Sequence, residues 1–189
     1  MRPRVKKAAK GRSGVVIVLG SLFLMLTMAP QLTLAQCTDG IENPAIESAT
    51  PSEDFRVRTD GTVLHRPTQL IWQRCAIGQS WTGTLCTGSA QLQDWTTALQ
   101  TAREHEQADA DDWRLPNRNE LASIVETRCH APAINGDAFP MAISDSYWTN
   151  SPTSELIDQV WVVLFADGEV LPTMVTELNA VRLVRSGRN

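Results

Sequence analysis

Four cysteines are the residues of this chain whose chemistry is easiest to predict. They are Cys37, Cys75, Cys86 and Cys129, and no two of them form a Cys-x-x-Cys pair. That spacing argues against a zinc ribbon. An even number of cysteines favours disulfides over metal or redox chemistry in a chain that is exported, which the first 35 residues of this chain predict. Three pairings are possible. We expect Cys75–Cys86, because these two bracket a short loop, and therefore Cys37–Cys129.

The loop between Cys75 and Cys86 is the best candidate for a ligand-binding site. It holds one large aromatic side chain, Trp81, among small polar residues. Such a side chain can stack on a sugar or pack against a protein, and a closed loop has little entropy left to lose on binding. The alternative, which the residues favour equally, is that Trp81 belongs to the core. The predicted ligand-binding residues are Trp81, Gln79, Ser80 and Thr82.

The acidic side chains between residues 104 and 112 could supply oxygen ligands for Ca²⁺. Their spacing is not that of an EF-hand loop, and glycine is absent from it. We therefore interpret the segment as a solvated helix end. His65, His105 and His130 fall in different elements without metal-ligand spacing. We predict no metal site and no cofactor.

Two further motifs have structural explanations that are simpler than catalysis. Cys129 and His130 are adjacent, but neighbouring residues of a strand point to opposite faces, and a disulfide would consume the thiol. In the segment Trp113-Arg114-Leu115-Pro116, the two apolar side chains are spaced to alternate into a core, and the arginine is expected to pair with a carboxylate. We predict no catalytic residue.

The first 35 residues have the order of a secretory signal peptide. Basic residues precede an apolar run from Val15 to Met28, and Thr33 and Ala35 supply small side chains for cleavage after Ala35. The alternative is a retained membrane anchor, but about 14 apolar residues are short against the roughly 20 that span a bilayer. We expect a secreted or periplasmic protein that has no membrane segment after cleavage.

Removal of the signal peptide changes the charge of the chain. Six of the 17 basic residues and none of the 21 acidic residues lie in residues 1–35, which leaves eleven arginines and a net charge of about −10. A domain this acidic is repelled by nucleic acid and by anionic membrane surfaces. We therefore exclude nucleic acid as a partner.

The elements that must position these residues follow from hydrophobic spacing and turn signals. Residues 36–54 are polar and predict an extended N-terminal arm, held mainly by Cys37, in front of one domain at residues 55–189. One helix is expected from Ser89 to Gln107, and a second begins at Asn117, where Asn117 and Glu120 form a capping box. The expected strands are 55–58, 62–65, 70–73, 147–149, 160–165, 169–171 and 180–184. This pattern predicts an α+β fold with a twisted antiparallel sheet and two main helices.

Several short motifs occur in an order that matches a known family. They are Gly61-Thr62-Val63, Leu70-Ile71-Trp72, Trp113-Arg114-Leu115-Pro116 with Glu120-Leu121, Tyr147-Trp148-Thr149 and Val181-Arg182-Leu183-Val184-Arg185. With these motifs, residues 55–186 resemble the C-terminal domain family of the Legionella collagen-like protein. That family usually has glycine where this chain has Gln69.

The resemblance implies an exported ligand-binding or structural module with a C-type-lectin-like or formylglycine-enzyme-like fold. The founding member is an adhesin, trimeric through its collagen-like region, that binds sulfated polysaccharide. That ligand does not suit a domain with a net charge of about −10, and no collagen-like Gly-x-y stretch is present here.

The function that we expect is that of a non-enzymatic binding or adhesion module of the bacterial envelope, with a polysaccharide or an envelope protein as partner. One alternative is a structural subunit of a surface or pilus-like assembly, which would form homo-oligomers. A weaker alternative is an enzyme of the formylglycine-generating type, which would need free cysteines.

Overall fold

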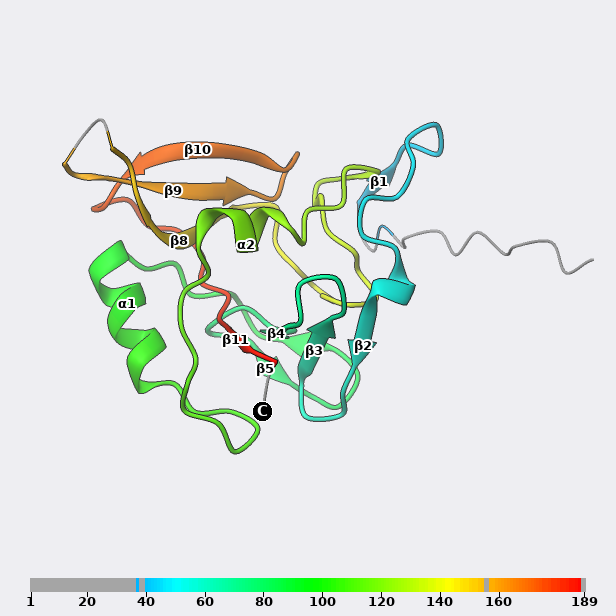
Figure 1. Ribbon diagram of the computed structural model, residues 1–189, viewed down its shortest axis with the longest axis horizontal. Helices are drawn as coiled ribbons and strands as arrows, with labels where there is room; N and C mark the ends of the chain where they lie inside the picture. Colours follow the sequence, from blue (N-terminus) through cyan, green and yellow to red (C-terminus); the bar gives the residue numbers. More distant parts are fainter. Residues whose placement is uncertain (1–36, 38–39, 155–156, 188–189) are drawn as a thin grey trace, which may run out of the picture. The chain divides into compact units, whose positions relative to one another are not determined.

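Antiparallel strands make up most of the regular structure (Figure 1). In the computed structural model, the described residues are 37, 40–154 and 157–187, so the predicted signal peptide and its cleavage site lie outside them. One sheet has the strand order β11–β4–β3–β2, a second has the order β10–β9–β8, and two ladders pair β1 with β7 and β5 with β6. The strands are β1 (Ile41–Glu42), β2 (Phe55–Val57), β3 (Thr62–His65), β4 (Leu70–Gln73), β5 (Ser80–Trp81), β6 (Cys86–Thr87), β7 (Cys129–His130), β8 (Ser146–Pro152), β9 (Gln159–Leu164), β10 (Glu169–Met174) and β11 (Val184–Ser186).

The first helix, α1 (Trp95–Glu104), is shorter than the sequence predicts. Asp94 caps it by accepting a hydrogen bond from the Thr97 N–H at 2.9 Å. The preceding residues are extended because backbone hydrogen bonds hold Gln91 and Gln93 to neighbouring segments. The expected start at Ser89 is therefore wrong, and Leu92 lies outside the helix and is exposed.

The second helix, α2 (Arg118–Ala122), begins where the sequence predicts. The Asn117 side chain accepts from the Glu120 N–H at 2.8 Å, and the Glu120 carboxylate accepts from the Asn117 N–H at 2.8 Å. Both halves of the capping box are thus present. The box satisfies two backbone donors at the start of a helix of five residues, which is too short to be stable alone.

The two helices cover opposite faces of the sheet formed by β8–β10. On one face of β9, Val163 packs in the cluster that includes Leu121 of α2. On the other face, Val162 packs in the cluster that includes Ala98 and Ala102 of α1. Both faces of β9 are therefore largely buried, which explains its nearly continuous apolar sequence. With antiparallel sheets, two helices and two disulfides, the α+β prediction is confirmed.

Just before β11, residues 180–183 do not form a regular strand. The sequence predicts a strand over 180–184, whereas β11 begins at Val184. In between, backbone N–H groups of Gln73 and Ile77 donate to Leu183 and Val181, and the Arg182 side chain enters the core. The segment thus connects the two sheets instead of continuing one ladder.

The turn between β3 and β4 explains why a glycine is expected before Leu70. Gln69 has a φ of 58°, in the left-handed region that favours glycine. Its side-chain amide donates to the Arg66 carbonyl at 2.7 Å, a local bond that compensates in part for the backbone strain.

The N-terminal arm is held by more than its disulfide. β1 pairs with β7, and the Arg128 guanidinium donates to the Glu42 carboxylate at 2.6 Å. The Glu126 carboxylate is fully buried and accepts hydrogen bonds from backbone or hydroxyl groups of Ser48, Ala49, Thr50 and Arg128, at 2.7–3.0 Å. We expected Cys37 to be the main attachment of the arm, but strand pairing, the Arg128–Glu42 ion pair and the hydrogen bonds of Glu126 hold the arm as well.

Two effects act on the pKa of Glu126. Burial raises the pKa, and the hydrogen bonds from Arg128, Ser48, Thr50 and Ala49 lower it. The hydrogen bonds prevail, so the folded-state pKa lies below the ordinary value of 4.5. The stabilisation of the folded state by the ionised Glu126 carboxylate is therefore complete above pH 4.5. It is lost as the pH falls through the lowered folded-state pKa.

We predict that Glu126→Gln lowers the free energy of unfolding by about 2–4 kcal/mol at pH 7, because an amide cannot accept all of these hydrogen bonds. Urea titration of the parent and the variant measures the difference. The difference should shrink below pH 4.5 as Glu126 becomes protonated. Glu169→Gln, at an exposed strand position, is the matched control and should change stability little. A Glu126→Gln variant as stable as this control would show that the carboxylate does not hold the arm.

Candidate functional site

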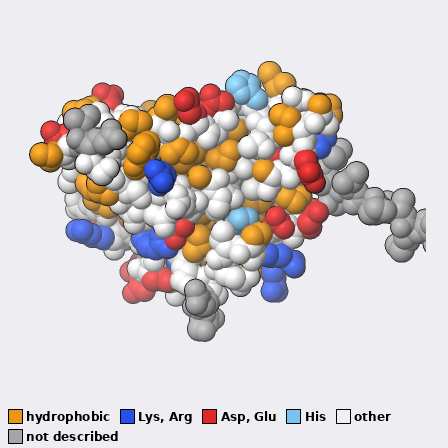
Figure 2. Space-filling model, turned by 45° about the horizontal axis from the view of Figure 1, so that its top comes forward, with side chains coloured by type: hydrophobic (Ala, Val, Ile, Leu, Met, Phe, Trp, Pro, Cys, Tyr) orange, Lys and Arg blue, Asp and Glu red, His pale blue; other side chains and the backbone are white. Residues whose placement is uncertain are grey.

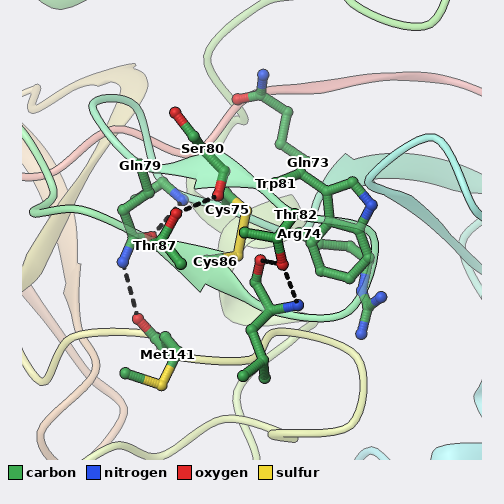
Figure 3. Close-up of a disulfide and its surroundings, with 12 residues drawn as sticks. Gln73, Arg74, Cys75, Gln79, Ser80, Trp81, Thr82, Cys86, Thr87 and Met141 are labelled. Atoms are coloured by element: carbon green, nitrogen blue, oxygen red, sulfur yellow. Dashed lines mark hydrogen bonds between the residues drawn. A yellow bond between two sulfur atoms is a disulfide. The ribbon is translucent and has the colours of Figure 1, made fainter.

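The candidate binding loop is closed by the disulfide between Cys75 and Cys86, whose Cα atoms are 5.5 Å apart (Figure 3). Cys37 and Cys129 form the second disulfide, with a Cα separation of 5.3 Å, so both predicted pairings are confirmed. Inside the loop, β5 pairs with β6 in register, Trp81 opposite Cys86. The loop is thus a small hairpin that is fixed by a covalent bond and by backbone hydrogen bonds.

Trp81 is half-buried and is held in one orientation. Its indole N–H donates to the Thr59 carbonyl at 3.1 Å, and the Arg74 guanidinium lies 4.3 Å from the ring centroid. A side chain at Gly61 would collide with the indole, because its Cβ would lie 2.9 Å from the ring. Gly61 also has a φ of 80°, which favours glycine independently. Trp81 therefore combines the two roles that the sequence leaves open: it packs on the domain and lines a surface.

That surface is a cleft of about 540 Å³ between the stapled loop and the end of α1. Gln79, Ser80 and Trp81 line it, whereas the fourth predicted residue, Thr82, does not. The Thr82 hydroxyl instead donates to the Leu85 carbonyl at 3.0 Å within the loop. The remaining lining residues are Asp60, Gln73, Cys75, Ala76, Ile77, Gly78, Thr101, His105, Glu106 and Gln107.

Part of the cleft lining is a polar network that the sequence does not predict. Gln73 is buried, and its amide nitrogen contacts His105 Nε2 and donates to Gln107 Oε1 at 2.8 Å. The Gln107 amide in turn donates to the Asp60 carbonyl at 3.2 Å. Gln73 ends a strand and the other two follow a helix, so no spacing in the sequence relates them.

The charges around the cleft are mostly negative or already paired. Asp60 and Glu106 are exposed on its lining. The Arg74 guanidinium is buried, donates to the carbonyls of Ala138 and Asp137, and stacks on Trp81. The cleft thus offers an aromatic ring, amides, hydroxyls and acidic groups. These groups suit a ligand rich in hydroxyl groups and are unfavourable for an anionic one.

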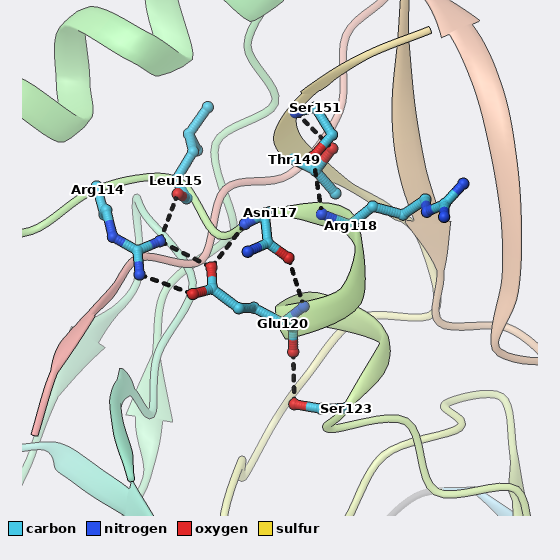
Figure 4. A network of polar contacts seen from close by, with 8 residues as sticks. All are labelled: Arg114, Leu115, Asn117, Arg118, Glu120, Ser123, Thr149 and Ser151. Atoms are coloured by element: carbon cyan, nitrogen blue, oxygen red, sulfur yellow. Dashed lines mark hydrogen bonds and ion pairs between the residues drawn. The ribbon is translucent and has the colours of Figure 1, made fainter. Parts of the chain in front are cut away.

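The Trp113–Pro116 motif has the structural role that the sequence predicts (Figure 4). Trp113 and Leu115 are buried in the core. Arg114 donates to both carboxylate oxygens of Glu120 at 2.8 Å. Burial raises the pKa of Glu120, but the hydrogen bonds from Arg114 and Asn117 outweigh it and leave the pKa below its ordinary value. The motif therefore fixes α2 against the core.

The acidic segment and the histidines do not come together. Within the described residues, no group of three or more His, Cys, Asp or Glu side chains is placed to hold a metal ion. Residues 106–111 form a tight loop in which Gln107 and Ala110 pair with each other. His65 is buried and stacks on Phe55 with ring centroids 4.9 Å apart, and burial lowers its pKa.

The order of these structural motifs along the chain is that of a known family. A family model described as Lcl C-terminal domain matches residues 61–185. The chain belongs to this family. The match includes the stapled loop, both helices and all strands from β3 to β10, and it leaves out the N-terminal arm. A search of curated proteins found none that matches the chain.

Membership in the Lcl C-terminal domain family indicates an envelope-associated domain. The two disulfides agree with this location, because disulfides persist in oxidising compartments outside the cytoplasm. Among the described residues, no helix is long and apolar enough to cross a membrane.

We predict that Asn117→Ala lowers the free energy of unfolding by about 1 kcal/mol, the usual effect of losing a helix N-cap. Thermal or urea unfolding of the variant measures this. The matched control is Asn119→Ala, which removes an exposed amide from the same helix but leaves the capping box intact. Equal stability of the two variants would show that the cap contributes nothing.

Proposed function

We propose that this protein is an exported, non-enzymatic binding module of the bacterial envelope, and that its cleft beside the Cys75–Cys86 loop binds a polysaccharide of uncharged sugars. The observation that carries the proposal is that the indole of Trp81, held by Thr59 and Arg74, lines the cleft together with amide and hydroxyl side chains. A flat aromatic ring can stack on the apolar face of a sugar, while amides and hydroxyls match its hydroxyl groups.

The rigidity of the loop supports binding at this cleft. The disulfide, the hydrogen bond to Thr59 and the contact with Arg74 hold Trp81 before any ligand arrives. A side chain that is already ordered loses less entropy on binding, so more of the contact energy contributes to affinity.

The state of the cysteines supports a non-enzymatic role. Enzymes of the formylglycine-generating type need free thiols, and here all four cysteines are paired. Catalysis of that kind would require reduction of a disulfide that anchors either the N-terminal arm or the candidate binding loop.

A structural subunit of a surface assembly is the second candidate. One observation favours it: Ile157, Met174 and Leu178 are exposed large apolar side chains near the ends of β9 and β10. Packing of such side chains between copies would bury apolar surface. The cleft has the stronger support, because it combines a defined volume with groups of matched chemistry.

We predict that Trp81→Ala weakens binding of a neutral polysaccharide by roughly 1–3 kcal/mol, because it removes the stacking surface. The ligand would come from a glycan-array screen, and calorimetry would compare the variants. Loss of the contact with Arg74 and of the hydrogen bond to Thr59 should also lower the free energy of unfolding, by about 1–3 kcal/mol, so thermal unfolding must show that the variant is folded. Thr82→Ala is the matched control within the loop and should bind like the parent, because Thr82 does not line the cleft.

Two outcomes would count against the cleft: unchanged affinity in a folded Trp81→Ala variant, or a loss in Thr82→Ala of the same size. Trp113→Ala provides the opposite reference. Because Trp113 is buried, its removal should lower the free energy of unfolding by about 3–5 kcal/mol.

Cleavage of the predicted signal peptide can be tested separately. We expect the exported protein to begin at Gln36, because Ala35 ends the predicted signal peptide. Intact-mass measurement of protein recovered outside the cytoplasm would test this. A mass that includes residues 1–35 would contradict cleavage and favour a retained anchor.

A further inference from the structure

A second groove, of about 720 Å³, lies at the start of α2 and shares no lining residue with the cleft. The turn between β3 and β4 forms one side, and residues of β8 and β9 form the other. Figure 2 shows apolar side chains gathered over the upper part of the face that it draws, with single charged groups among them. The lining residues are Thr68, Leu70, Asn117, Arg118, Asn119, Glu120, Ser151, Pro152 and Trp161.

The groove exists because α2 is too short to cover the whole face of β9. Side chains alternate along the strand, so Trp161 lies on the same face as the buried Val163. α2 packs against β8 and β9 and leaves Trp161 half-buried. An indole that is partly open to solvent therefore forms the apolar part of the groove together with Leu70 and Pro152.

An arginine lies over this indole. The Arg118 guanidinium is 5.0 Å from the Trp161 ring centroid, and the Arg118 backbone N–H donates to Ser151 Oγ at 3.0 Å. In the described part of the chain, no carboxylate lies within ion-pair distance of this guanidinium. By contrast, the neighbouring Arg114 is fully engaged by Glu120. In Figure 4 the Arg118 side chain extends away from that ion pair.

The rim of the groove is polar but mostly neutral. Asn119, Thr68 and Ser151 present amide and hydroxyl groups, which both donate and accept hydrogen bonds. The charge of Glu120, the acidic residue of the lining, is balanced by Arg114. The groove therefore differs from the cleft at Trp81: its aromatic ring is accompanied by an exposed cation instead of by carboxylates.

We propose that this groove binds a carboxylated sugar unit of an acidic polysaccharide. The planar guanidinium of Arg118 pairs with the carboxylate in a two-pronged geometry. The indole of Trp161 stacks on the apolar face of the sugar ring, and the amides and hydroxyls of the rim bond its hydroxyl groups. Although the domain is acidic overall, distant charges are screened beyond about 8 Å at physiological salt, so the local cation decides the charge preference.

A peptide carboxylate is a weaker candidate for the same groove. A single exposed arginine could pair with it, but the flat ring and the short amide and hydroxyl side chains match a polyhydroxylated ring better than a backbone. The groove is a surface separate from the cleft, so binding at the groove does not depend on binding at the cleft.

The test is calorimetric binding of a galacturonate oligosaccharide to the full-length chain, with a galactose oligosaccharide of equal length as the neutral probe. We expect binding of the acidic probe, and Arg118→Gln should weaken it about tenfold or more, the effect of a charge-assisted pair. Arg103→Gln removes the same charge from an exposed position of α1 and should bind like the parent. Trp81→Ala should also leave this binding unchanged, which separates the two sites.

Trp161→Leu is a second variant that removes the stacking ring and keeps an apolar side chain at the position. It should weaken binding of the acidic probe while Arg118 remains present. The proposal is overturned if the galacturonate oligosaccharide does not bind, if the neutral probe binds equally well, or if Arg118→Gln behaves like Arg103→Gln. Tighter binding of a glutamate oligomer than of the acidic sugar would also overturn it.

Discussion

The arrangement of the β11–β4–β3–β2 and β10–β9–β8 sheets depends on the interactions of the buried Arg182 guanidinium. It is almost fully buried, and within the described residues it has no carboxylate partner. Instead it donates to the carbonyls of Gln73 and Arg74 at 2.8 and 2.5 Å, and it packs against the rings of Phe139 and Tyr147. A buried charge is costly unless polar groups replace its water. These carbonyls and rings replace part of that water, and burial still lowers the pKa of the arginine. The carbonyls belong to the end of β4, so the C-terminal segment is bound to the start of the stapled loop.

The candidate cleft is built directly on this attachment. The side-chain oxygen of Gln73 accepts from the Leu183 N–H at 3.2 Å, and its amide nitrogen contacts His105 and Gln107, which also line the cleft. Arg74 donates to backbone carbonyls near Ala138 and stacks on Trp81. Each wall of the cleft is therefore connected to the core by groups that are themselves buried. Such supporting contacts hold a site in a defined geometry, which reduces the entropy lost when a ligand is bound.

A second buried charge, for which the described part of the chain supplies no ion-pair partner, organises another part of the domain. Glu126 gathers backbone and hydroxyl donors from the N-terminal arm, next to the disulfide between Cys37 and Cys129. Together Glu126 and Arg182 show how a domain with a modest core fixes its peripheral segments. A charged side chain can bind several backbone groups at once, and it needs no regular ladder to do so. The irregular segments at 43–50 and 181–183 are consequently well attached although they lie outside the strands.

The sequence by itself determined the features that depend on neighbouring residues. The capping box at Asn117, the strands β2 to β4, the local disulfide and the family motifs all follow from patterns within a few positions of the chain. It also marked Trp81 as unusual, because a large aromatic side chain stands alone among small polar ones. Only the tertiary structure decided that α1 starts at Trp95, since backbone hydrogen bonds to distant segments keep residues 91–93 extended. The same holds for the wall formed by Gln73, His105 and Gln107, for the attachment of Arg182 and for the groove at Trp161. These sites join segments far apart in the chain, and their geometry is set by packing, which local residue preferences do not encode.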